Sequence, residues 1–111
     1  MGHTDRVPRY VFPPDMPASV REVVALNVPL AWGVVHQLAT AGRELTLREL
    51  RDSLGGVDDA TLTRRLDALR AARLVHANPP DRRQGHTVRY RLDHERLDAL
   101  VVEWSAYVRG H

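Results

Sequence analysis

Two adjacent glycines, Gly55 and Gly56, constrain the fold of this chain more than any other local feature. They separate two segments in which leucines recur at the three- and four-residue spacing of a helix with one buried face. These leucines are Leu47, Leu50 and Leu54 before the glycines, and Leu62, Leu66 and Leu69 after them. The sequence therefore predicts two short helices joined by a tight turn, with the second helix over residues 58–73.

Both predicted helices begin with residues that can cap a helix. Thr46 and Glu49 have the spacing of a capping box, and Asp58 is the expected N-cap of the second helix. The exposed side of the first two turns of the second helix then carries small, hydroxyl and guanidinium side chains. They belong to Ala60, Thr61, Thr63, Arg64 and Arg65. Such a surface is either a solvated helix face or lies against a negatively charged partner.

A predicted β-hairpin follows the second helix. Residues 74–78 and 87–92 have strand character, and the second segment alternates apolar and basic side chains. Its apolar side consists of Val88, Tyr90 and Leu92, and its basic side of Arg89 and Arg91. The connecting segment PPDRRQGH is rich in turn-forming residues and contains Arg82 and Arg83. We expect the hairpin to occupy residues 74–92.

Proline dominates the N-terminal flank of the chain. Residues 1–17 contain four of the seven prolines, a density that forbids a helix and favours an extended arm. The apolar side chains of this arm, from Tyr10 to Phe12, are expected to pack on the domain or on a partner subunit. Residues 18–111 are expected to form the folded domain, since about 100 residues suffice for one modest core.

Three more helices are expected in this domain. Ser19 is expected to cap a short helix, and Pro29 to begin the next, which ends near Gly42. Asp93 is expected to cap the last helix, over residues 93–109, whose apolar stripe consists of Leu97, Leu100, Val101, Trp104 and Val108. Such a stripe can line a ligand pocket but is more typical of a seam between two subunits. The chain as a whole is predicted to be α+β and mostly helical.

The composition excludes several classes of site. There is no cysteine, which removes disulfides, thiolate metal ligands and cysteine nucleophiles and is typical of a cytoplasmic protein. The histidines lack metal-binding spacing, and neither a glycine-rich phosphate loop nor a nucleophile motif is present. We therefore expect no enzyme activity, no cofactor and no metal. No apolar run approaches the roughly 20 residues of a membrane span, and we expect no signal peptide, because no apolar segment follows the charges of MGHTDRVPRY.

Positive charge is concentrated in one third of the chain. All 16 basic residues are arginines. Residues 58–91 carry eight of them against four acidic residues, a net charge of +4, whereas the rest carries eight against ten, a net charge of −2. A local positive field of this kind is the pattern expected of a surface that binds a polyanion.

The stretch VDDATLTRRLDALRAARLV, residues 57–75, resembles the recognition helix and following strand of winged helix-turn-helix transcriptional regulators of the ArsR and MarR type. The matching positions are Val57, Thr61, Leu62, Thr63, Arg64 and Leu66. The stretch DRRQGHTVRYRL, residues 81–92, resembles the wing of the same regulators. The resemblance covers residues 28–108, and the terminal helix favours the ArsR-like architecture. Because the thiolate ligands of the metal-sensing members are absent, no metal-sensing role is implied.

The resemblance implies a homodimer, formed through the N- and C-terminal helices, that binds a palindromic site on double-stranded DNA. The recognition helix would read the major groove, and Arg82 and Arg83 in the wing would touch the minor groove or flanking phosphates. Arg89 either joins them or belongs to the wet face of its strand. The expected function is cytoplasmic, sequence-specific transcriptional regulation, with repression as the expected mode. The alternatives are a winged-helix protein-interaction adaptor, or a DNA-binding factor for plasmid or phage replication, partition or excision.

Overall fold

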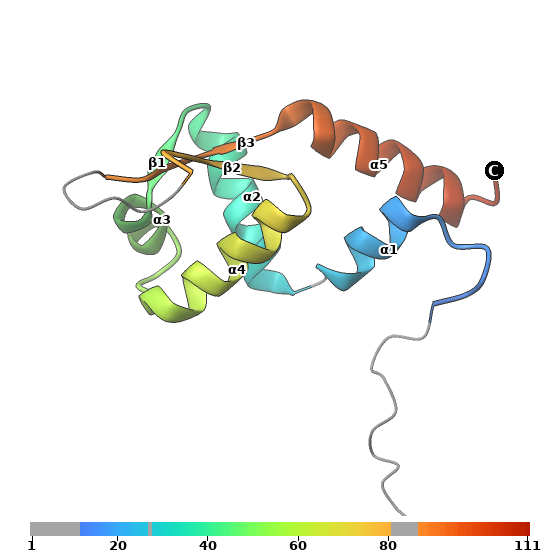
Figure 1. Ribbon diagram of the computed structural model, residues 1–111, viewed down its shortest axis with the longest axis horizontal. Helices are drawn as coiled ribbons and strands as arrows, with labels where there is room; N and C mark the ends of the chain where they lie inside the picture. The colour runs from blue at the N-terminus through green and yellow to red at the C-terminus, as the bar shows by residue number, and fades with distance from the viewer. Residues whose placement is uncertain (1–11, 27, 81–86) are drawn as a thin grey trace, which may run out of the picture.

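The computed structural model describes residues 12–26, 28–80 and 87–111. Within these residues the protein has an α+β fold that is mostly helical, as predicted (Figure 1). The elements are, in chain order, α1 (Ala18–Ala25), α2 (Pro29–Ala41), β1 (Leu45–Thr46), α3 (Leu47–Ser53), α4 (Asp59–Ala71), β2 (Val75–Asn78), β3 (Arg89–Leu92) and α5 (His94–Val108).

Helices α3 and α4 are the pair predicted on either side of the two glycines, and their capping confirms the sequence pattern. The Thr46 hydroxyl accepts a hydrogen bond from the backbone N–H of Glu49 (3.1 Å), and the Glu49 carboxylate accepts one from the backbone N–H of Thr46 (2.9 Å). Asp58 accepts a hydrogen bond from the backbone N–H of Thr61 at 3.1 Å. Both helix starts are therefore fixed by local side chains.

The three strands form an antiparallel sheet in the order β1-β3-β2. β2 and β3 are the predicted hairpin strands, with Val75 opposite Leu92 and Asn78 opposite Arg89. β1 was not predicted, because two residues are too few to show an alternating pattern. Leu45 of this strand lies opposite Tyr90, so β1 completes the sheet through a pairing between residues distant in sequence.

The core lies where α2, α3 and α4 meet the inner face of the sheet (Figure 1). The predicted inward leucines of α4 are fully buried, as is Leu50 of α3, whereas Leu47 and Leu54 are half-buried against them. On β3 the predicted alternation is confirmed: Tyr90 and Leu92 are buried and the two arginines are exposed.

The start of α1 differs from the prediction. The helix begins at Ala18 with Pro17 as its N-cap, so Ser19 lies inside the first turn and does not cap it. Pro17 has φ −61° and an extended ψ of 153°, which places the next residue at the start of the helix. The predicted arm falls largely on residues 1–11, which lie outside the described residues. Phe12 is described, and the Arg21 guanidinium lies over its ring, 5.7 Å from the centroid.

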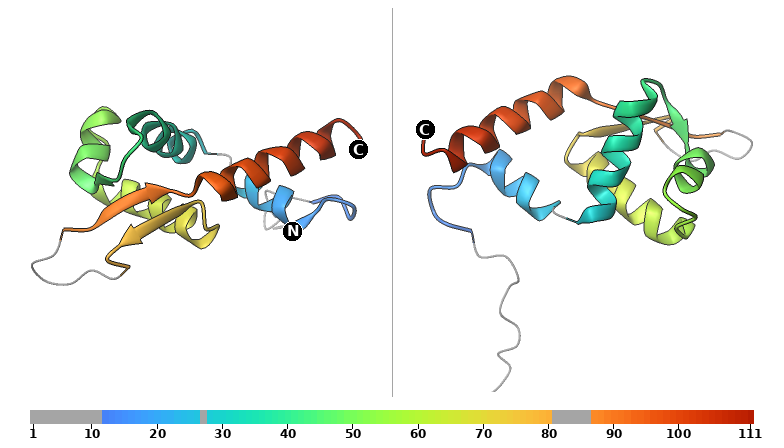
Figure 2. Two further views of the ribbon diagram at one scale, coloured as in Figure 1. Left: turned by 90° about the horizontal axis from the view of Figure 1, so that it is seen from above. Right: turned by 180° about the vertical axis from the view of Figure 1, so that it is seen from behind.

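Helices α1 and α5 pack against each other on one side of the molecule, away from α3 and the β2–β3 hairpin (Figures 1 and 2). Leu100 of α5 is buried, but Val101, Val102, Trp104 and Val108 are large apolar side chains left exposed. No single helix in the described segments is long and apolar enough to cross a membrane; α1 and α2 meet that test only as a pair bent by 101°.

Candidate nucleic-acid interface

Helix α4 has one buried face and one fully exposed face. Leu62, Leu66 and Leu69 have no exposed surface. The exposed residues recur at the same helical spacing on the opposite side: Ala60, Arg64, Asp67 and Ala71. The other three predicted contact residues, Thr61, Thr63 and Arg65, are half-buried and flank this face. Of the five predicted residues of α4, the structure therefore places Ala60 and Arg64 on the exposed face, with Thr61, Thr63 and Arg65 partly covered beside it.

Arg64 is the arginine best placed on α4 to reach a ligand. It is exposed, and no residue in the described part of the chain makes an ion pair or hydrogen bond with its guanidinium. Its charge acts on Asp58, whose pKa lies below its ordinary value. Hydrogen bonds from the Thr61 hydroxyl and backbone N–H are the main causes, and the charge of Arg64 adds a smaller effect. The five donors of Arg64 remain available for a planar acceptor pair.

Thr61 and Arg65 are more constrained than Arg64. The Thr61 hydroxyl donates a hydrogen bond to Asp58 Oδ1 at 2.7 Å and so supports the helix cap. Arg65 is half-buried, and its Nε is shielded from solvent without a hydrogen-bond partner among the described residues. The sequence pattern does not distinguish Arg64 from Arg65, because helical spacing alone does not show how far a flanking side chain is covered.

Asp59 is neutralised by an ion pair that the sequence did not reveal. Arg51 Nη1 of α3 donates to Asp59 Oδ1 at 2.9 Å, while the Asp59 side chain stays 56% exposed to solvent. This contact spans the turn between the two helices and reduces the negative charge at the N-terminal end of α4. The only available signal was the opposite charge of two residues on either side of the glycines.

Two more exposed arginines lie on the outer face of the sheet and, together with Arg64 of α4, make up the basic surface of the molecule. Arg89 and Arg91 are exposed, with Asn78 and His76 respectively opposite them on β2. A groove between α4 and β2 is lined by Asp67, Arg70, Ala71, Val75, His76, Ala77, Pro80 and Arg91. Arg70, which the sequence analysis did not single out, donates to the Pro80 carbonyl oxygen at 2.8 Å and ties the residues after β2 to α4. Arg82 and Arg83 lie outside the described residues.

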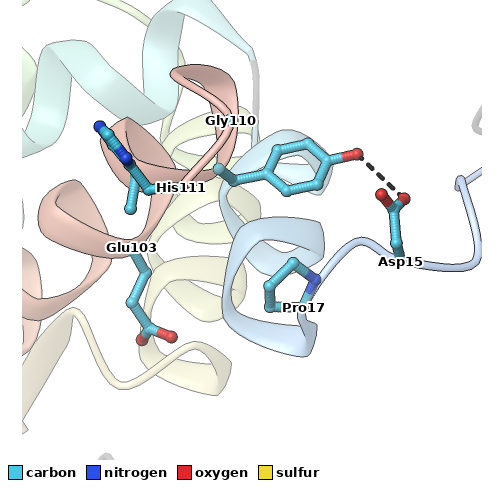
Figure 3. A pocket seen from close by; sticks show the side chains of 7 residues that line it. Asp15, Pro17, Glu103, Gly110 and His111 are labelled. Atoms are coloured by element: carbon cyan, nitrogen blue, oxygen red, sulfur yellow. Dashed lines mark hydrogen bonds between the residues drawn. The ribbon is translucent and has the colours of Figure 1, made fainter.

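The opposite end of the molecule has a different character. A pocket there is formed by residues before α1 and the end of α5, and it presents the carboxylates of Asp15 and Glu103 (Figure 3). The Tyr107 hydroxyl donates to Asp15 at 3.4 Å, and burial, followed by the charge of Asp15, raises the pKa of Tyr107. Acidic groups of this kind repel phosphate, so the candidate interface is limited to the end that carries α4 and the hairpin.

The described residues contain no group of three or more histidine and acidic side chains that could hold a metal ion. No protein-family model matches the chain, and no curated protein matches it. The function of the chain is therefore inferred from the geometry of α4 and the sheet.

Proposed function

We propose that this protein is a winged helix-turn-helix DNA-binding protein that acts as a homodimer on a palindromic site and regulates transcription, with repression as the simplest mode. The observation that carries the proposal is the exposed face of α4, where Arg64 has free donors on a helix whose opposite side is completely buried. The order of α3, α4 and an antiparallel hairpin, together with the local positive charge, supports it.

In this proposal α4 enters the major groove of B-DNA, which is about 12 Å wide and admits one helix. The small side chain of Ala60 allows close approach, and Arg64 donates two hydrogen bonds to guanine O6 and N7. Thr63 and Arg65 contact neighbouring bases or phosphates from the flank. Arg89, with Arg82 and Arg83 between the strands, approaches the adjacent backbone and minor groove.

The proposed dimer uses the apolar stripe of α5. Leu97, Val101, Trp104 and Val108 follow one another at intervals of four, three and four residues, which is the spacing of a two-helix seam. Val101, Trp104 and Val108 are 53%, 43% and 56% exposed in the single chain. A second copy that covers this stripe would place two α4 helices in successive major grooves, about 34 Å apart.

Selection of bound DNA from a random library tests the proposal. We expect a two-fold symmetric consensus, and Arg64→Ala is expected to weaken binding to it by about 1–3 kcal/mol and to relax the base preference at one position in each half-site. Arg65→Ala is expected to have a smaller effect, since Arg65 is partly covered. Arg109→Ala is the matched control, because it removes an exposed arginine at the far end of α5.

Salt dependence separates the possible outcomes. Replacing a proposed phosphate contact such as Arg82 by alanine is expected to lower the affinity for all DNA sequences. It is also expected to reduce the slope of log affinity against log salt by about one. If no sequence is enriched and the wild type is not retained on DNA even at low salt, a protein-interaction adaptor replaces this proposal. If the selected site occurs in plasmid or phage DNA at replication, partition or excision regions and not at promoters, those roles would replace transcriptional regulation.

A further inference from the structure

The first turn of α5 is held by a cluster of polar contacts that joins three helices and the sheet. Arg96 Nε donates to the carbonyl oxygen of Ala72 at 3.2 Å, and its Nη2 donates to Glu22 Oε1 at 2.6 Å. Ala72 is the C-cap of α4, and Glu22 belongs to α1. One guanidinium therefore connects the end of the candidate recognition helix to the α1–α5 pair.

Neighbouring contacts hold the Arg96 backbone in place. Asp93 caps α5 by accepting a hydrogen bond from the Arg96 N–H at 2.9 Å, and its own N–H donates to the Leu74 carbonyl oxygen at 2.8 Å. His76 of β2 also bonds to the Asp93 carboxylate, with 2.8 Å between Nε2 and Oδ2. The hydrogen bond from His76, followed by the one from Arg96, lowers the pKa of Asp93.

Arg96 is the least exposed polar side chain of this cluster. The Arg96 side chain is only 19% exposed, whereas its partner Glu22 is 38% exposed, so the ion pair is shielded on the arginine side alone. The planar guanidinium fixes the direction of each donor, and two of its donors are directed at different helices. Apart from this cluster and the core contacts of Leu97 and Leu100, α5 packs mainly on α1 (Figure 2).

We propose that Arg96 is a positioning residue that fixes the angle between the α1–α5 pair and α4. Because α5 carries the exposed stripe assigned to the dimer seam, this angle determines how far apart the two α4 helices of a dimer lie. The DNA consequence rests on the proposed function: Arg96 sets the half-site spacing that the dimer accepts, without touching DNA. The angle itself is a property of the single chain and is testable without DNA.

The test without DNA measures the distance between spin labels on the two parts. The chain has no cysteine, so Ala60→Cys on α4 and Val102→Cys on α5 give two unique attachment points, both exposed. Labelled protein is diluted into unlabelled protein, so that only distances within one chain are read. We expect a narrow distance distribution in the wild-type background, a broad or shifted one with Arg96→Ala, and partial recovery with Arg96→Lys, which keeps the charge and can still donate to one partner.

Two further variants distinguish the loss of the Arg96 contacts from a general loss of folding. Glu22→Gln removes only the charge of the α1 partner and is expected to broaden the distribution less than Arg96→Ala. Arg109→Ala removes the exposed arginine that follows α5 and is expected to leave the distribution unchanged. Circular dichroism checks that each variant is folded. If folded Arg96→Ala gives the wild-type distribution, the proposal is wrong, whatever Glu22→Gln gives.

The test with DNA uses selected sites whose half-sites are moved apart or together by one base pair. We expect wild type to prefer one spacing, and Arg96→Ala to lose about tenfold of that preference while still forming dimers. If wild type selects no DNA site but Arg96→Ala broadens the label distances, the proposed function fails and the positioning role stands. If wild type selects a site and Arg96→Ala keeps both the distances and the spacing preference, the positioning role fails alone.

Discussion

At the scale of single residues, Glu49 shows how one carboxylate fixes the approach to the candidate interface. It accepts hydrogen bonds from the Thr46 N–H and from Arg43 Nη2, each at 2.9 Å. The Arg43 hydrogen bond is the main reason that the pKa of Glu49 falls from 4.5 to about 2, followed by the bond from Thr46. The folded state therefore favours the ionised carboxylate at the start of α3.

The lowered pKa predicts a stability change confined to acid. Because the folded pKa lies below the unfolded one, the contribution of Glu49 is fully present above pH 4.5 and is lost as the pH falls toward 2. We expect Glu49→Gln to lower the melting temperature at neutral pH, and the gap to wild type to close over this range. Melting curves between pH 2 and pH 7 measure it, and a gap of constant size would contradict the assignment. Glu44→Gln, a nearby glutamate with no such cap, is the control.

At the scale of elements, the sequence predicted what depends on neighbours along the chain. The caps at Thr46 and Asp58 and the alternation on β3 are local patterns, and the structure confirms them. β1, the Arg51–Asp59 ion pair and the Arg96–Glu22 ion pair join residues that only the fold brings together. For the same reason the pattern of α4 did not show that Thr61, Thr63 and Arg65 are partly buried, whereas Ala60 and Arg64 are exposed as predicted.

The turn between α3 and α4 depends on the left-handed backbone of its glycines. Gly55 and Gly56 have φ of 80° and 81°, and the Gly56 N–H donates to the Arg51 carbonyl oxygen at 2.9 Å, which closes the end of α3. A Cβ at Gly55 would meet no atom within 4 Å, so only backbone strain opposes a side chain there. We expect Gly55→Ala to destabilise the protein by about 1–2 kcal/mol in urea unfolding.

Asparagine separates this strain from a loss of packing. It tolerates the left-handed region better than alanine does, so Gly55→Asn is expected to be less destabilising than Gly55→Ala although its side chain is larger. An equal or greater loss for asparagine would mean that space around the turn, and not its backbone conformation, limits the residue at this position.

At the scale of the whole molecule, the two surfaces used in the proposed function lie apart. The basic surface lies on α4 and the sheet, whereas the exposed apolar stripe lies on α5, on the other side of the molecule (Figure 1). DNA contact and self-association would therefore not compete for the same residues. The Arg96 cluster joins α1, α4 and α5 and so lies between these two surfaces. In the proposed positioning role it would set their relative orientation.

Two adjacent valines allow the proposed dimer seam to be tested with matched variants. Val101 lies on the stripe with Trp104 and is 53% exposed, whereas Val102 lies off it and is 66% exposed. We expect Val101→Glu to give monomers, because a carboxylate buried at a seam without a partner is costly, and Val102→Glu to remain dimeric. Sedimentation velocity measures the difference, and binding to the selected palindrome is expected to weaken only for Val101→Glu. If both variants stay dimeric, the subunits associate through another surface, because both copies would carry the Val101→Glu carboxylate and two like charges would oppose an apolar seam.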